Sequence, residues 1–183
     1  SMTVQIQYNG ANTWQFKFVK VGVTTASLVG NWKLAPVAGA LAVGESADNL
    51  AWWSSTEEDA TTRACLFDDV FTFGSDGSFS QDMGSETWVE AWQGTDPEGC
   101  ATPVSPHDGG YTDGTYSVAD SKVTVNGLGA HLGLPKVTGS GEISDVANAV
   151  STITYNVTEF ATDGNSMTVQ IQYNGANTWQ FKF

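Results

Sequence analysis

The chain carries the same eighteen residues at both of its ends. The segment SMTVQIQYNGANTWQFKF begins at residue 1 and again at residue 166, which sets a period of 165 residues. Eighteen varied positions do not stay identical through long divergence, so the duplication is either recent or deliberately made. A period of this size suits one domain. We predict that residues 19–183 are one full period of a tandem array, preceded by the tail of the period before it. The alternative is a segment copied for permutation or strand complementation.

The copied segment has the pattern of a β-hairpin. Apolar and polar residues alternate in two runs, and Asn9-Gly10 lies between them in a sequence typical of a tight turn. An isolated two-stranded hairpin is not stable in water, so this one is expected to dock on a larger sheet. Its apolar face supplies our candidate self-association residues in both copies: Val4, Ile6, Tyr8, Trp14, Phe16 and Phe18, and Val169, Ile171, Tyr173, Trp179, Phe181 and Phe183.

The chain has two copies of the hairpin but one domain for them to complete, which leaves two arrangements open. In one, a protruding hairpin completes the sheet of an identical neighbouring unit, as in donor-strand complementation. In the other, each hairpin closes its own unit and residues 1–18 are a leftover. The short segment Val19–Ala26 favours the second arrangement slightly, because it resembles a connection between complete modules. We therefore divide the chain into a terminal hairpin (1–18), a connector (19–27) and one complete β-domain (28–183).

Composition narrows the class of protein. Seven Lys and Arg residues stand against twenty Asp and Glu, a net charge of −13, which disfavours nucleic acid and anionic membrane surfaces as partners. The longest apolar stretch, Ala35–Val43, is too short to span a bilayer. Cys65 and Cys100 are expected to form one disulfide in an oxidising compartment, with two buried free thiols as the alternative. We expect an extracellular or cell-surface protein, whose secretion signal would lie upstream of this sequence.

Most of the chain reads as short strands separated by turns. Leu66–Gly74 and Ser78–Met83 flank an Asp-Gly turn, and Glu86–Gln93 alternates like a strand. Gly94–Gly114, rich in Pro and Gly, is expected to be a loop, and Ser54–Thr62 one or two helical turns capped by Ser54 or Ser55. The pattern predicts an all-β fold of about eight to ten antiparallel strands, a meander that closes as a barrel or as a two-sheet sandwich.

Several motifs resemble a known family. Gly30-Asn31-Trp32 resembles the opening G-x-W motif of lipocalin-like domains. A longer set of strings is similar to a module that recurs in secreted surface and polysaccharide-associated proteins of marine bacteria: Trp32–Pro36, Trp52–Ser54, Arg63–Asp69 and Pro106–Gly109. The resemblance covers residues 28–183. It implies a secreted β-barrel or sandwich module, often a non-catalytic appendage, and it carries over no catalytic residue.

The candidate binding residues are aromatic and acidic. If Glu86–Gln93 is one strand, Glu86, Trp88, Glu90 and Trp92 share a face and could stack and hydrogen-bond a sugar. The alternative is that this face packs under the 94–114 loop. Trp52 and Trp53 form a second candidate edge, or a plug for one end of the fold. Carboxylates four residues apart on a strand stand roughly 13 Å apart, too far for either geometry of glycoside hydrolysis.

These observations favour a non-enzymatic function. We expect an extracellular structural or adhesive repeat unit of a large bacterial surface protein or filament, assembled with identical neighbours, free of cofactors and without catalytic residues. Calcium at a junction between units stays open, although the acidic turns lack the EF-hand spacing. The rival hypothesis is a non-catalytic carbohydrate-binding module of a polysaccharide-degrading system.

Overall fold

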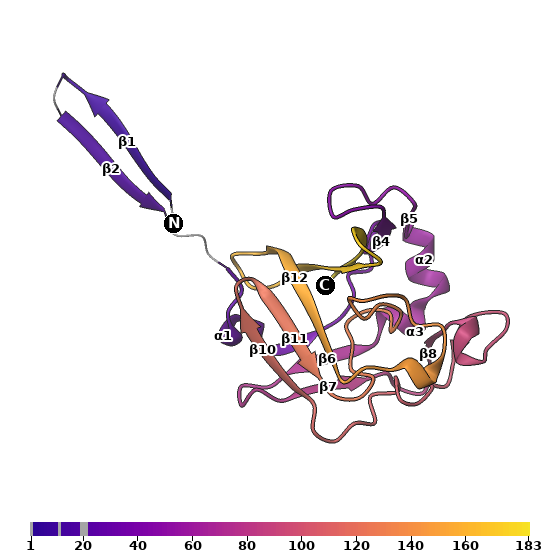
Figure 1. The fold of residues 1–183 in the computed structure, drawn as a ribbon. Coiled ribbons are helices and arrows are strands. Elements are labelled where there is room, and N and C mark those ends of the chain that lie inside the picture. The colour runs from indigo at the N-terminus through magenta and orange to yellow at the C-terminus, as the bar shows by residue number, and fades with distance from the viewer. Residues whose placement is uncertain (1, 11, 19–21) are drawn as a thin grey trace.

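The computed structural model describes residues 2–10, 12–18 and 22–183 and shows an antiparallel all-β fold (Figure 1). Nothing is described of residues 1, 11 and 19–21, which include part of the predicted connector. The elements in chain order are β1 (Met2–Tyr8), β2 (Asn12–Phe18), α1 (Thr25–Leu28), β3 (Gly30–Trp32), β4 (Leu41–Gly44), β5 (Trp53–Ser54), α2 (Glu57–Thr62), α3 (Ala64–Phe67), β6 (Val70–Phe73), β7 (Phe79–Asp82), β8 (Thr87–Val89), the 3-10 helix η1 (Ala91–Gln93), β9 (Gly99–Ala101), β10 (Thr115–Ala119), β11 (Lys122–Asn126), the 3-10 helix η2 (Val146–Asn148), β12 (Thr152–Phe160), β13 (Met167–Tyr173) and β14 (Asn177–Lys182).

Two sheets enclose the core. The larger has the strand order β10-β11-β12-β13-β14-β4-β5, and the smaller has the order β3-β6-β7. They approach each other at one border, where Ser78 and Thr115 form an isolated bridge. Aromatic side chains join them across the interior: the ring of Phe71 meets that of Phe183 edge-on at 5.5 Å. The described strands do not close into one barrel, so the sandwich alternative is confirmed.

The two copies of the hairpin have the same internal structure. In both, the fourth residue of the segment pairs with the sixteenth, so Val4 faces Phe16 and Val169 faces Phe181. The turn is the same too: Asn9 and Asn174 have φ angles of 46° and 44°. The eighteen residues therefore specify one hairpin, whatever surrounds it.

The surroundings differ completely. β13 and β14 lie inside the seven-stranded sheet, between β12 and β4, whereas β1 and β2 pair with each other in a separate two-stranded sheet. Figure 1 shows that hairpin, in indigo, apart from the body that holds the yellow copy. Trp14 and Phe16 are 59% and 42% exposed, and their counterparts Trp179 and Phe181 are 6% and 1% exposed.

The same contrast runs through the other predicted association residues. Ile6 is 55% exposed and Val4 is half-buried, while the side chains of Tyr8 and Phe18 lie outside what the structure describes. The C-terminal residues are all buried: Val169, Ile171, Tyr173 and Phe183.

The sequence underestimated the number of strands and misplaced several boundaries. Residues 28–183, all of them described, form twelve strands, β3 to β14, where about eight to ten were expected. β4 was missed because all four of its residues are buried and its sequence does not alternate, and β9 was missed within the predicted 94–114 loop. The helix in the predicted Ser54–Thr62 segment is capped by Thr56, whose hydroxyl accepts from the Asp59 amide at 3.2 Å, so the prediction of Ser54 or Ser55 as cap is wrong.

The predicted disulfide is confirmed. Cys65 and Cys100 are bonded, with 5.9 Å between their Cα atoms, and the bond ties α3 to β9. The core also reaches into the predicted connector, since Val23 is buried and the capping box of Thr24 and Ser27 starts α1 there. No helix among the described residues is long and apolar enough to cross a membrane.

The duplicated sequence allows a matched pair of substitutions. Phe181→Ala is expected to lower the free energy of unfolding by about 3–5 kcal/mol, because it leaves a cavity in the core. Phe16→Ala, the same change in the same local sequence, is expected to alter it by less than about 0.5 kcal/mol, because the side chain lies on an exposed hairpin. Urea unfolding of both variants checks this. Equal losses would contradict the two environments.

Candidate functional site

The first candidate site is the place that the C-terminal hairpin occupies, which we call the hairpin slot: the gap between β12 and β4 that β13 and β14 fill. On one side Asn156 pairs with Gln170, and on the other Val43 pairs with Trp179. The slot therefore supplies ladder partners to both strands of the hairpin. Without a hairpin, β12 and β4 would each expose an unpaired edge.

The slot covers both faces of the hairpin. On the core side, Trp179 stacks on Phe181 at 6.1 Å, and Phe183 reaches Phe71 of the smaller sheet. On the other side, the amide of Gln170 donates to the Ala47 carbonyl at 3.2 Å and to the Gln180 side chain at 3.1 Å. The polar face of the hairpin is thus partly covered by the chain that follows β4.

The described part of the connector begins close to the end of the slot. Gly22 and Ser27 line a hollow of about 390 Å³ together with the segment from Phe160 to Gly164, which leads from β12 into β13. Three residues separate Phe18 from Gly22, and an extended residue spans about 3.3–3.6 Å. A hairpin attached at residue 19 is therefore tethered near the same slot as the hairpin attached at residue 165.

The second candidate site is a groove of about 440 Å³, which we call the tryptophan groove. Trp52, Trp53 and Trp179 line it, with Tyr173 from the hairpin and the buried Val43 and Leu134 at its floor. Trp52 is 55% exposed. The remaining lining residues are charged: Arg63, Lys136, Glu90, Glu98 and Glu142.

Arg63 is held between two indole rings. Its guanidinium carbon lies 4.1 Å from the centre of the Trp88 ring and 5.4 Å from that of Trp53. The carboxylates of Glu98 and Asp59 lie 3.8 and 3.9 Å from guanidinium nitrogens. The two rings and the two carboxylates together hold the guanidinium, so Arg63 presents N–H donors at a fixed position in the groove that it lines.

The other cation, Lys136, is held by a buried acid. Its ammonium lies 2.9 Å from the Glu90 carboxylate, which is 4% exposed, and 5.6 Å from the centre of the Trp179 ring. Trp92 donates its indole N–H to the other oxygen of Glu90 at 2.7 Å. Each carboxylate oxygen of Glu90 thus accepts a hydrogen bond from the protein, and Glu90 orients Lys136 at the groove.

The predicted strip of Glu86, Trp88, Glu90 and Trp92 does not exist as one face. The strand ends at Val89 and the chain turns into η1, so the expected strand over 86–93 is wrong. Glu90 is buried, whereas the next residue, Ala91, is exposed. Trp92 packs edge-on against His107 at 5.5 Å, in the segment between β9 and β10, in agreement with the alternative reading.

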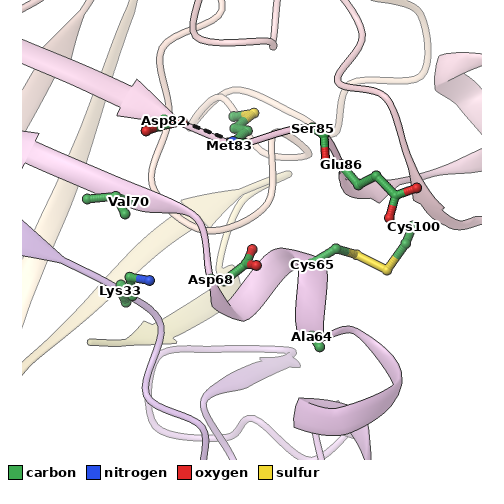
Figure 2. A pocket seen from close by; sticks show the side chains of 11 residues that line it. Lys33, Ala64, Cys65, Asp68, Val70, Asp82, Met83, Ser85, Glu86 and Cys100 are labelled. Atoms are coloured by element: carbon green, nitrogen blue, oxygen red, sulfur yellow. Dashed lines mark hydrogen bonds between the residues drawn. A yellow bond between two sulfur atoms is a disulfide. The ribbon is translucent and has the colours of Figure 1, made fainter.

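Glu86 lies in a different hollow. Figure 2 shows it beside Cys100 and the disulfide, in a depression of about 430 Å³ that Lys33, Asp68 and Asp82 also line. Among the described residues no group of three or more His, Cys, Asp or Glu side chains is arranged to hold a metal ion. The predicted site residues therefore divide between two places. Trp52, Trp53 and Glu90 line the tryptophan groove, with Trp88 in contact with Arg63 and Trp92 bonded to Glu90, whereas Glu86 lies apart.

Three ionisable groups, Asp69, His107 and His131, are buried and line neither hollow. Burial raises the pKa of Asp69 to about 7, partly offset by the hydroxyl of Thr87, which donates to it at 2.7 Å. Burial lowers the pKa of His131 to about 3 and also lowers that of His107. The two imidazoles are therefore neutral at pH 7. They belong to the core and offer no metal site between them.

Sequence reasoning missed Arg63, Lys136 and the groove role of Trp179. The first two are isolated cations without a motif, and their partners lie far along the chain: Glu90 is 46 residues from Lys136. No family model matches this chain, and no curated protein or solved structure is significantly similar to it. The resemblance to lipocalin-like modules stays a prediction, and the class of the fold rests on the structure itself.

Asp69 makes stability depend on pH. An unfolded Asp releases its proton near pH 4 and the folded one near pH 7, so the folded state binds the extra proton between these values. The stabilisation that this proton gives the folded state is complete below about pH 4 and is lost as the pH rises to about 7. The loss amounts to up to a few kcal/mol. Asp69→Asn is expected to gain stability relative to the wild type as the pH rises from about 5 to about 8.

The comparison has to be made between variants, because the two buried histidines act in the opposite direction. Urea unfolding at several pH values measures it, with the exposed Asp113→Asn as the control. A difference between Asp69→Asn and wild type that does not change with pH would show that Asp69 titrates normally.

Proposed function

We propose that this chain is a repeat unit of an extracellular structural or adhesive assembly, in which the eighteen-residue hairpin is the element that joins units. The observation that carries the proposal is the pair of hairpins. One fills the hairpin slot, and the other has the same register and turn and an exposed apolar face. The disulfide between Cys65 and Cys100 and the acidic composition agree with an extracellular setting.

The free hairpin has the shape that the slot accepts. Binding therefore requires little rearrangement of the donor, which lowers the cost of association. The six apolar residues on the hairpin's core face are each worth about 1.5–3 kcal/mol when buried. Their sum is comparable to the whole stability of a domain, about 5–15 kcal/mol. A unit with an empty slot is thus expected to be unfolded until it receives a hairpin.

When two units that already have hairpins exchange them, the free energy of the contacts in the slot hardly changes. A neighbour's hairpin replaces an identical one, so no interaction is gained or lost in the slot. The exchanged state then depends on concentration and on the tether at each end of the hairpin. In a tandem array every junction hairpin is followed by the short connector, which starts beside the next slot. Each junction hairpin can therefore serve either of the two units that it separates.

The direct test offers the spare hairpin an empty slot. Residues 19–165 have the slot but neither hairpin, and the full chain has a hairpin to donate. Refolding the two together is expected to give a folded one-to-one complex, because the hairpin of residues 1–18 completes the sheet of the fragment. Size-exclusion chromatography with light scattering and circular dichroism detect it.

Residues 19–183, which have no spare hairpin, are the control. They are expected to leave the fragment unfolded, and Phe16→Ala in the full chain is expected to weaken the complex by the cost of a core cavity. If the full chain captures no more of the fragment than residues 19–183 do, the hairpin does not join units and the proposal is wrong.

A further inference from the structure

The tryptophan groove has the size and lining of a ligand site. Its volume of about 440 Å³ lies within the range of about 300–1,000 Å³ that small-molecule pockets occupy. Two parts of the fold supply its aromatic wall. Trp52 and Trp53 come from the β4–β5 hairpin, and Tyr173 and Trp179 come from β13 and β14. The rings of Trp53 and Trp179 lie 6.3 Å apart at an angle of 55°, which forms the corner of the groove.

The side chains around the groove are held in place before any ligand arrives. Trp88 and Trp53 enclose Arg63, and buried Glu90 fixes Lys136. The indole N–H of Trp179 is directed at Glu142, at 3.5 Å. Such preorganised donors and acceptors beside aromatic faces reduce the entropy that binding costs. By contrast Trp52, at 55% exposed, is an aromatic surface that water still covers.

The chemistry of the lining favours an uncharged, hydroxyl-rich ligand. Two cations and three carboxylates line the groove, so neither a strong anion nor a strong cation finds a matching field. The protein's net charge of −13 further repels polyanions. A sugar ring with equatorial hydroxyls has an apolar C–H face that stacks on indole, and hydroxyls at its edge that bond to charged groups of either sign.

We infer that the tryptophan groove binds a neutral polysaccharide, with a sugar ring stacked on Trp52 and its hydroxyls bonded to Lys136, Arg63 and Glu142. This inference is independent of the joining of units, because it needs only an occupied slot. It gives the C-terminal hairpin a second function, because Tyr173 and Trp179 complete the wall of the groove.

Titration calorimetry with laminarin and with cellohexaose tests the inference on the full chain. At least one of these neutral β-glucans is expected to bind once per chain with a Kd below about 1 mM. Trp52→Ala is expected to weaken binding about tenfold or more, as truncation of an aromatic anchor does. Trp52→Phe is expected to retain part of the affinity. Leu128→Ala is the control: Leu128 is an exposed apolar residue outside the groove and outside both hairpins, and its loss is expected to leave binding unchanged.

Three results would overturn the inference. They are the absence of binding by both glucans, equal affinity of Trp52→Ala and wild type, and tighter binding of the polyanion alginate than of either neutral glucan. Circular dichroism and the unfolding midpoint of each variant show that it is folded. Trp52 and Leu128 are both more than half exposed, so neither substitution is expected to destabilise the protein appreciably.

Discussion

The fold depends on one insertion: β13 and β14 lie between β12 and β4 and are hydrogen-bonded on both sides. This pair of strands provides the centre of the larger sheet, and its apolar face provides much of the core that meets the smaller sheet. It also contributes the corner of the tryptophan groove through Tyr173 and Trp179. Sheet, core and groove are therefore completed by the last eighteen residues of the chain, and the same eighteen residues stand at its beginning.

The duplication separates local from tertiary causes of structure. The register and the turn of the hairpin are the same in both copies, so the Asn-Gly turn and the alternation of side chains determine them. The apolar face is exposed in the N-terminal copy and buried in the C-terminal copy, so its burial is determined by the strands beside the hairpin and not by the hairpin's own sequence. An exposed apolar hairpin is a surface that monomeric proteins usually avoid, because it pairs with whatever edge it meets. In this chain, the edges that match the hairpin are those of β12 and β4, which β13 and β14 occupy.

The sequence predicted what depends on short-range patterns. The all-β class, the disulfide and the hairpin followed from alternation, from a pair of cysteines and from Asn-Gly. It did not predict β4, whose four buried residues lack a period, or the end of β8, where Glu90 turns inward to meet Lys136. Only some of the residues that line the tryptophan groove were predicted from the sequence. Trp52 and Trp53 are adjacent in sequence, but Arg63, Lys136 and Trp179 join them only through the topology of the sheet.

Amide hydrogen exchange followed by NMR tests the central claim most directly, because it compares one sequence in two places within one molecule. In dilute solution, the amides of β13 and β14 are expected to exchange only on global unfolding, whereas those of β1 and β2 are expected to exchange many orders of magnitude faster. That result would establish one occupied slot and one hairpin available to a partner. Equal protection of the two copies would contradict the account, because both hairpins would then be docked or would share one slot by rapid exchange.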